Sequence, residues 1–512
     1  MRTLRTIRTS TAGTRRRGAR RTAATAAVVA TTALTGAAVQ AAPAGGTAPT
    51  GTAPARAAAS PGAAGLGDPL FPLDGNGGYE VTHYTLDFDW RAPRTPFPAT
   101  ATVRATATQP LSRFNLDFAG NTLRSVTVDG TAATAVREGD ELVVTPRGPL
   151  ARGRPFTVEV AYTADPTQTR HRGDAVKDYG WIPTPDGTVL HPQPNGARLV
   201  FPSNDHPSRR APLTFRVTTP PGLRAAANGR LTARTEHPDG RVTWTYDSEQ
   251  PVAPQLVQLA VGRFAFAERT GPGGLPLRDV VPDALAAPTE RYRALTSAHL
   301  TWLERRLGPY PFRRYGVLVG DVDRRAALET QTLSLVTKPV LLGDRVAAER
   351  VLVHELTHQW TGDSVALETW SDLWLSEGHA RFYDRLYAEE HGGGGLEAAM
   401  RTAYGNHDRW RRAQGAPAEP AEPALFGSMR YDGSALVLYA LREEIGADAF
   451  ARVERAWVTE YRGRTAGTRD YVALASRVAG RDLTDFLRPW LYGGRTPPMP
   501  GHPDWRTAPV RG

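Results

Sequence analysis

The stretch His354-Glu-Leu-Thr-His358, followed downstream by Trp-Leu-Ser-Glu377, decides the fold and the chemistry predicted for this chain. On an α-helix, residues i and i+4 share one face, so His354 and His358 can hold one Zn²⁺ through their imidazole nitrogens. Glu355 points beside that face, where its carboxylate can take a proton from the attacking water as a general base. Glu377, on the next predicted helix, supplies a third ligand. Two histidines and one glutamate leave a position open, which is typical of a catalytic zinc site.

An HExxH motif alone is also compatible with a helix whose polar face happens to contain two histidines. The surroundings favour the metal site. Glu377 lies in an apolar, tryptophan-rich stretch, where an unpaired carboxylate would be unfavourable unless it is neutralised or bound to a metal. Apolar residues around the motif predict a packed helix that holds the histidines in place; they are Val351, Leu352, Val353, Leu356 and Trp360. We therefore predict one Zn²⁺ per chain.

The positive charge of the chain is concentrated at its N-terminus. The formal net charge is +10, and the first 41 residues contain eight arginines and no acidic residue, so the remainder carries only 10 − 8 = +2. This balance does not favour a nucleic-acid partner.

An apolar stretch at 23–39 follows the arginines, and small residues follow it, which predicts a secretory signal peptide over 1–41. Export through the Sec route and through the twin-arginine route both fit this pattern.

The apolar stretch is too short to span a membrane as a stable helix, so no membrane span is expected in the mature protein. The chain has no cysteine, which excludes disulfides, cysteine-ligated metals and a cysteine-linked lipid anchor. We expect a secreted protein, most simply a monomer.

Composition and periodicity divide the chain. Residues 42–76 are rich in Ala, Gly, Pro and Thr and are predicted to form a disordered linker. Residues 77–281 contain short segments with a period of two and many β-branched residues, which predicts antiparallel sheets with one face in water. Residues 282–500 are mostly helical with a β-rich patch at 315–340, and residues 501–512 form a tail. The fold class is therefore a multi-domain α+β protein.

Three helices are predicted around the motif. The first covers 289–308 and ends at a glycine; its His299 lies on an apolar face, where it is either a buried core residue or a ligand, and the core is favoured. The second begins at an Asp344 cap, carries the HExxH motif and ends at Gly362. The third begins near Ser371 or Asp372 and ends before the four glycines at 392–395.

Beyond the zinc motif, the chain closely resembles the M1 family of zinc metallopeptidases, the gluzincin aminopeptidases, over roughly residues 70 to 500. The resemblance is carried by HELTHQW and WSDLWLSEG, by the segments Gln193-Pro-Asn-Gly-Ala-Arg198, Phe201-Pro-Ser-Asn-Asp205-His-Pro207, Asn228-Gly-Arg-Leu231 and Gly308-Pro-Tyr-Pro-Phe312, and by Tyr431-Asp-Gly-Ser-Ala-Leu-Val-Leu438. It implies an N-terminal β-sandwich-like domain followed by a thermolysin-like, mostly helical α/β catalytic domain. It also implies a short form that lacks the large helical C-terminal domain of longer relatives, and hence a more open cleft.

The resemblance assigns roles to individual residues. His354, His358 and Glu377 would ligate zinc and Glu355 would activate water. Tyr431 would donate a hydrogen bond to the oxyanion; on the residue pattern alone it would be a core tyrosine at a helix start.

A further pair of residues would select the free end of the substrate. The resemblance implies that Glu329 binds the α-amine and that Gln193 assists it. The family has Gly-x-Met-Glu-Asn around this glutamate, and the present chain has Ala326, Leu328 and Thr330 in place of Gly, Met and Asn, which alters the pocket for the first residue.

Two residues near the motif are ambiguous or excluded. Asp384 lies two helical turns after Glu377, where it either accepts a hydrogen bond from a zinc-binding histidine or pairs in solvent with Arg381 or Arg385. His379 is close to Glu377 in sequence but points to another face of the helix, so it is not predicted as a ligand.

The predicted function is that of a secreted zinc aminopeptidase acting on peptides. A zinc endopeptidase or another zinc hydrolase remains an alternative, because the ligand set does not distinguish cleavage at the end from cleavage in the middle. A non-enzymatic binding protein on the same scaffold is a further alternative.

Overall fold

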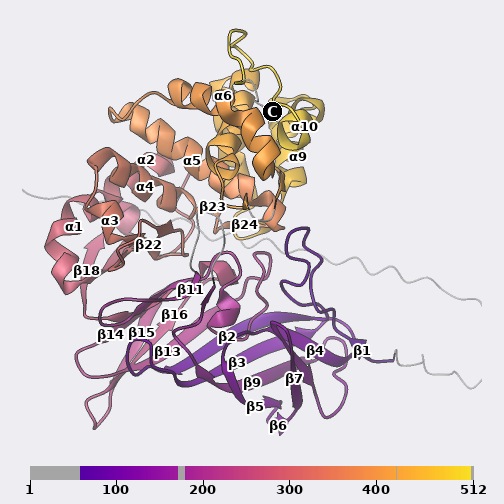
Figure 1. Cartoon of the computed structure of the whole chain (residues 1–512), viewed down its shortest axis with the longest axis vertical. Coiled ribbons are helices and arrows are strands. Elements are labelled where there is room, and N and C mark those ends of the chain that lie inside the picture. Colours follow the sequence, from indigo (N-terminus) through magenta and orange to yellow (C-terminus); the bar gives the residue numbers. More distant parts are fainter. Residues whose placement is uncertain (1–57, 171–178, 422–423, 509–512) are drawn as a thin grey trace, which may run out of the picture. The chain divides into compact units, whose positions relative to one another are not determined.

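An eight-stranded sheet forms the largest part of the N-terminal half (Figure 1). The computed structural model describes residues 58–170, 179–421 and 424–508, so the predicted signal peptide lies outside the described residues. In sheet order the strands are β15 (Arg230–Glu236), β16 (Val242–Asp247), β13 (Leu213–Thr219), β2 (Tyr79–Asp89), β3 (Phe97–Ala107), β9 (Pro155–Ala164), β5 (Thr122–Val128) and β6 (Thr131–Ala132). Adjacent strands are antiparallel except for β13 and β2, which are parallel.

The period of two in the sequence places alternate side chains in the core. In β2 the side chains of Tyr84, Leu86 and Phe88 are buried, while the residues between them are more exposed. Phe88 contacts Phe97 and Trp181 through tilted and edge-on ring contacts inside this core. The predicted β-rich N-terminal domain is therefore confirmed.

Two smaller sheets complete the β half. One has the order β1 (Ser60–Pro61), β4 (Leu111–Asp117), β8 (Glu141–Thr145) and β7 (Thr134–Glu138). The other has the order β10 (Thr169–Arg170), β11 (Tyr179–Pro183), β12 (Thr188–His191), β17 (Leu259–Gly262) and β14 (Arg224–Ala227).

A further five-stranded sheet joins the β half to the helical half. Its order is β18 (Phe264–Thr270), β19 (Pro276–Pro282), β20 (Val317–Gly320), β22 (Ser334–Thr337) and β21 (Ala327–Leu328). The domain boundary predicted at 281 falls inside this sheet, because β19 pairs in parallel with β20. The short strand β21 forms one edge of the sheet and leads directly into Glu329.

Helices dominate the rest of the chain and confirm the predicted mixed, mostly helical second half (pink through orange to yellow in Figure 1). They are α1 (Ala286–Arg293), α2 (Thr296–Leu307), α3 (Lys338–Leu341), α4 (Arg345–Thr357), α5 (Leu373–Glu390), α6 (Leu396–Gln414), α7 (Ser434–Ile445), α8 (Ala447–Glu460), α9 (Thr468–Ala479) and α10 (Thr484–Tyr492). Short strands lie between them: β23 (Thr361–Gly362) and β24 (Val365–Leu367) with β27 (Thr465–Ala466), and β25 (Gly415–Ala416) with β26 (Glu419–Pro420).

The helix that carries the motif begins as predicted but ends earlier. The Asp344 side chain accepts a hydrogen bond from the Ala347 backbone N–H and caps α4. The helix stops at Thr357 rather than at the predicted Gly362, because residues 361–362 pair as strand β23. Gly362 has a φ of 119°, a backbone conformation that would be strained for a residue with a side chain. This glycine therefore lies in the turn after the helix and not at the helix end.

Of the other two predicted helices, the first is divided in two, and the second is confirmed, because α5 begins next to Asp372 and ends before the four glycines. The helix predicted over 289–308 is two helices, α1 and α2, separated at residues 294–295, and Gly308 terminates the second with a φ of 93°. Helix α5 starts at Leu373 after one 3₁₀ turn, Trp370–Asp372. A capping box of Thr369 and Asp372 caps the N-terminal end of this turn.

The prediction of a disordered linker to residue 76 is wrong for its described part, residues 58–76. Strand β1 pairs with β4, and Asp68, Asp74 and Asn76 are buried. One Asp68 oxygen accepts hydrogen bonds from the backbone N–H groups of Leu70 and Phe71, and the other accepts one from the backbone N–H of Trp370. A few polar side chains with buried partners thus anchor a segment whose composition offers little apolar surface.

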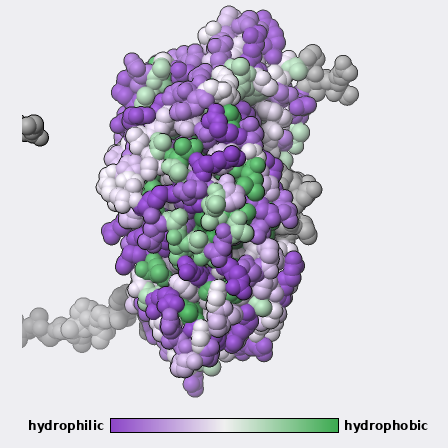
Figure 2. Space-filling model, turned by 90° about the vertical axis from the view of Figure 1, so that its left-hand side faces the viewer, coloured by the Kyte–Doolittle hydropathy of each residue, from purple (hydrophilic) through white to green (hydrophobic). Residues whose placement is uncertain are grey.

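On the face drawn in Figure 2, apolar residues form small groups separated by hydrophilic ones. Among the described residues, no helix combines the length and the apolar character needed to cross a membrane.

Candidate active site

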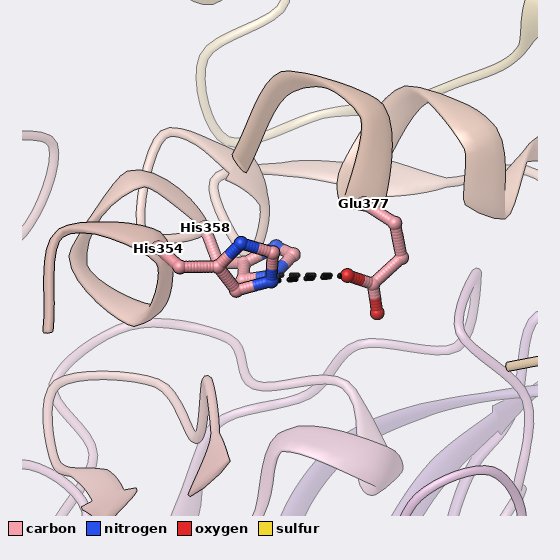
Figure 3. A group of neighbouring side chains, drawn as sticks. All are labelled: His354, His358 and Glu377. Carbon is pink, nitrogen blue, oxygen red and sulfur yellow. Dashed lines mark hydrogen bonds and ion pairs between the residues drawn. The ribbon is translucent and has the colours of Figure 1, made fainter. Parts of the chain in front are cut away.

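The three predicted zinc ligands converge from two packed helices (Figure 3). His354 lies in the last turn of α4, His358 directly follows it, and Glu377 lies in the second turn of α5. The Nε2 atoms of the two histidines are 3.2 and 3.4 Å from the same oxygen, Glu377 Oε2. Ligand atoms about 2.1 Å from a tetrahedral zinc ion lie about 3.4 Å from one another. The observed spacing therefore fits a zinc ion bound by these three atoms.

Outer hydrogen bonds fix which nitrogen of each ring faces Glu377. His354 Nδ1 lies 3.1 Å from Asp384 Oδ2, and His358 Nδ1 lies 2.9 Å from Ser376 Oγ. Because each Nδ1 is engaged, each Nε2 is left to bind a metal, as in other zinc sites with oriented histidines.

Asp384 contacts both His354 and Arg381, so the two alternatives for this residue each hold in part, but it is buried and not in solvent. It also accepts hydrogen bonds from Arg350 and Arg381, whereas Arg385 bonds to Asp432 instead. Burial opposes its ionisation, but the charge of Arg381 and the hydrogen bond from His354 lower the pKa of Asp384 below its usual value. A charged Asp384 holds the His354 ring in place and increases its basicity as a ligand.

Glu377 is held as an anion between the histidines. Burial opposes its ionisation, yet the charge on His358 and hydrogen bonds from both histidines bring the pKa of Glu377 to about 2. This carboxylate is therefore available as an anionic ligand at neutral pH.

A cavity of about 360 Å³ contains the ligand triad and every other predicted site residue. Glu355 lines it and lies, with Glu329 and His358, in a group of side chains whose ligand atoms are within 4.8 Å of one another. Burial raises the pKa of Glu355 to about 8. This carboxyl group is thus suited both to accept a proton and to release it again near neutral pH.

Glu329 and Gln193 form a pair within the cavity although they are far apart in sequence. Gln193 Nε2 donates a hydrogen bond of 2.8 Å to Glu329 Oε1, and burial raises the pKa of Glu329. Gln359, next to His358, donates to the backbone carbonyl of Glu329 at 3.1 Å. The segment that carries Glu329 is therefore tied to the end of the zinc helix.

Tyr431 lies in a π-helical turn, Met429–Gly433, that precedes α7. Its ring centroid is 6.0 Å from that of His354, and the guanidinium of Arg381 lies over its face at 5.4 Å. Its side chain lines the same cavity, so it is placed beside the metal ligands rather than in the apolar core. π-turns inside helices are frequent at functional sites.

His299 and His379, two histidines that were not predicted as ligands, are core residues. His299 is buried and packs edge-on against Tyr387. His379 Nε2 lies 3.2 Å from Glu454 Oε1, on the far side of α5 from the ligands. Both predictions about these residues are confirmed.

Sequence reasoning missed three supporting residues: Ser376, Arg350 and Gln359. Arg350 precedes His354 by one helical turn, which is a signal that could have indicated a partner on the same face. Ser376 and Gln359 directly adjoin ligands, but only the tertiary packing shows which atoms they contact.

Family models match both halves of the chain. The Peptidase M1 N-terminal domain matches residues 80–254, and the Peptidase family M1 domain matches residues 294–490. The crystal structure of an M1 zinc metallopeptidase from Deinococcus radiodurans is 32% identical, with a TM-score of 0.76, and covers 85% of this chain and 98% of that one. The chain belongs to peptidase family M1.

Further relatives show how much of the family the chain represents. A mutant of the Deinococcus enzyme was solved with a Tyr-Ser-Ala substrate; it is 32% identical with a TM-score of 0.76, and the match covers 86% of this chain and all of that one. Leukotriene A-4 hydrolase of Xenopus laevis is 27% identical over 60% of this chain and 52% of its own length. The chain spans about half the length of the curated relatives it matches or less, and nearly the whole length of the two-domain structures. Family and geometry together identify a zinc metallopeptidase whose candidate zinc ligands are His354, His358 and Glu377.

Replacing Ser376 with alanine should weaken zinc binding without unfolding the protein. The change removes the nearer of two hydrogen-bond partners of His358 Nδ1 and leaves the Thr361 carbonyl at 3.3 Å, and loss of such outer partners lowers metal affinity about 10- to 100-fold. Competition with a chromogenic chelator measures the affinity. Ser297→Ala on α2 is the matched control and should bind zinc like the wild type; equal affinities of both variants would contradict the role of Ser376.

Proposed function

We propose that the protein is an exported zinc-dependent aminopeptidase that removes the N-terminal residue from peptides. The observation that supports this most is the Gln193–Glu329 pair, because it lies in the same cavity as the zinc ligands and the general base. A carboxylate in a closed pocket suits a free α-ammonium group, which a peptide has only at its N-terminus.

Glu355 moves the proton in the proposed reaction. When bound, the zinc ion would polarise the scissile carbonyl and make water a better nucleophile. Glu355 takes the proton of the attacking water and later delivers it to the nitrogen of the leaving amine. Glu355 lines the cavity beside the candidate zinc ligands, where its carboxyl group can both accept a proton and release it.

Tyr431 and the Glu329 pair position the two ends of the reacting residue. The Tyr431 hydroxyl donates a hydrogen bond to the oxyanion that develops on the carbonyl. Burial raises the pKa of Tyr431 well above its usual value, so this donor keeps its proton. Glu329 and Gln193 hold the α-ammonium and thereby set the scissile bond one residue from the N-terminus.

The altered residues around Glu329 change the cavity wall in a specific way. Leu328 is buried in an apolar cluster with Leu333 and Leu335. Ala326 and Ala327 line the cavity instead. Ala326 stands where the family has glycine, so its methyl group adds to this part of the cavity wall.

The Glu355→Gln variant should lose turnover while retaining its fold and its zinc. Glutamine has a similar shape but cannot accept the proton, and loss of a positioned general base lowers rates about 10²- to 10⁴-fold. Hydrolysis of an alanyl fluorogenic amide and the zinc content of the purified protein measure the two properties. Wild-type turnover in this variant would contradict the mechanism, and inactivity of the wild type would support a non-enzymatic binding protein.

Acetylation of the substrate N-terminus should abolish most hydrolysis. It removes the positive charge that Glu329 would bind, and a hydrogen bond to a buried charge contributes about 1.5–3 kcal/mol, or about 10- to 100-fold in rate. Comparing kcat/KM for leucine anilide and its N-acetyl form tests this. Equal values would favour a zinc endopeptidase, and the Glu329→Gln variant should reduce the difference between the two substrates.

Export rests on the arginine-rich start and the apolar stretch at 23–39, which lie outside the described residues. Cleavage after the small residues near 41 would remove this segment. Expression in a secreting bacterial host, followed by N-terminal sequencing of protein from the medium, tests the proposal. Recovery only inside the cell with residues 1–41 intact would contradict it.

A further inference from the structure

The active-site cavity extends from the zinc ligands toward the beginning of α4. Ala347, Val351 and His354 all line it, and their spacing of i, i+4 and i+7 places them on one face of the helix. At a rise of 1.5 Å per residue, the seven residues from His354 to Ala347 span about 10 Å. The cavity is therefore long enough for more than the residue that is removed.

Arg325 lies at this second end. It is exposed, lines the cavity, and donates one hydrogen bond of 2.9 Å to the backbone carbonyl of Pro339. Gly343, which precedes the cap of α4, lies against the same side chain, since a β-carbon there would be 3.1 Å from Arg325 Nη1. These contacts place the guanidinium near the N-terminal end of α4, away from His354.

Arg325 differs from the other arginines in the cavity in having no carboxylate partner among the described residues. Arg350 and Arg381 both form ion pairs with Asp384, which neutralises them in part. In the described part of the chain, no carboxylate pairs with Arg325. A guanidinium has five N–H donors, and most of those of Arg325 remain available for a ligand.

The edge strand β21, which leads to Glu329, limits the distance between Arg325 and Glu329 at the two ends of the cavity. Arg325 and Glu329 are four residues apart, and the chain between them includes strand β21, so their Cα atoms are at most about 13 Å apart. An extended tripeptide is about 10 Å long. If its ammonium group lies on Glu329, its C-terminal carboxylate comes within reach of the long Arg325 side chain.

The geometry points to Arg325 as a receptor for a carboxylate on the leaving part of the substrate, two residues beyond the scissile bond. This rests on the proposed aminopeptidase function and extends it to a substrate class: short peptides, of which the tripeptide fits best. The same chemistry would accept an acidic side chain at the third position of a longer peptide. Ala326, Ala327 and Val340 line the same cavity and give it apolar surface.

Three substrates test the inference: trialanine, trialanine amide, and Ala-Ala-Glu amide. In the wild type, kcat/KM for trialanine should exceed that of its amide by about three- to tenfold, a modest factor because the pair is exposed to solvent. Faster hydrolysis of Ala-Ala-Glu amide than of trialanine amide would show that a side-chain carboxylate also binds. Product release is followed by chromatography.

Variants assign the effect to the residue. Arg325→Gln should bring the ratio of acid to amide close to one, and Arg325→Lys should restore part of it. Arg345→Gln is the matched control, since Arg345 is exposed at the start of α4, carries the same charge, and does not line the cavity; its ratio should equal that of the wild type.

The outcomes separate this inference from the proposed function. Hydrolysis of trialanine and its amide with equal kcat/KM overturns the role of Arg325 and leaves the aminopeptidase function intact. A preference for the acid that persists in Arg325→Gln overturns it as well. If no substrate is hydrolysed by the zinc-loaded wild type, the proposed function itself fails.

Discussion

The packing of α5 against α4 is the constraint on which the rest of the site depends. It brings Glu377 to within 3.4 Å of both histidine Nε2 atoms, and it places Asp384 and Ser376 against the opposite nitrogens of the same rings. The contact between these two helices thus positions the ligand Glu377 and the two residues, Asp384 and Ser376, that hold the histidine rings. A displacement by one helical turn would remove the contacts together, because Ser376, Glu377 and Asp384 are all carried by α5.

Several buried carboxyl groups meet in one cavity, and the charges around them decide which ionise. Arg350 and Arg381 keep Asp384 charged, and the histidines keep Glu377 charged. Burial raises the pKa of both Glu355 and Glu329, because it outweighs the opposite effect of the same two histidines. The site therefore contains two kinds of carboxyl group. Glu377 and Asp384 are anions that bind the metal and hold its ligand, whereas in the proposed reaction Glu355 exchanges a proton and Glu329 receives the substrate cation.

Contacts between the two halves of the chain extend the site beyond the helices. Gln193 comes from the β half and reaches Glu329 at the edge strand of the joining sheet. The segment before residue 77 makes a second connection, where Asp68 accepts a hydrogen bond from the Trp370 backbone and Phe71 packs edge-on against the Trp370 ring. The two partners of these hydrogen bonds are 136 residues apart in sequence in the first contact and 302 in the second.

The sequence by itself determined the local elements: strands with a period of two, the Asp344 cap, and a helix that puts His354 and His358 on one face. It also determined the third ligand, because a lone glutamate in a tryptophan-rich helix needs a partner. The helix end at Thr357 and the order in residues 58–76 were decided by the tertiary structure alone. The family resemblance placed Gln193 and Glu329 at one site, but their hydrogen bond is shown only by the tertiary structure. Periodicity and capping act over a few residues and can be read locally. A strand pairing, a buried carboxylate or an interdomain hydrogen bond depends on which distant atoms the fold brings within bonding distance.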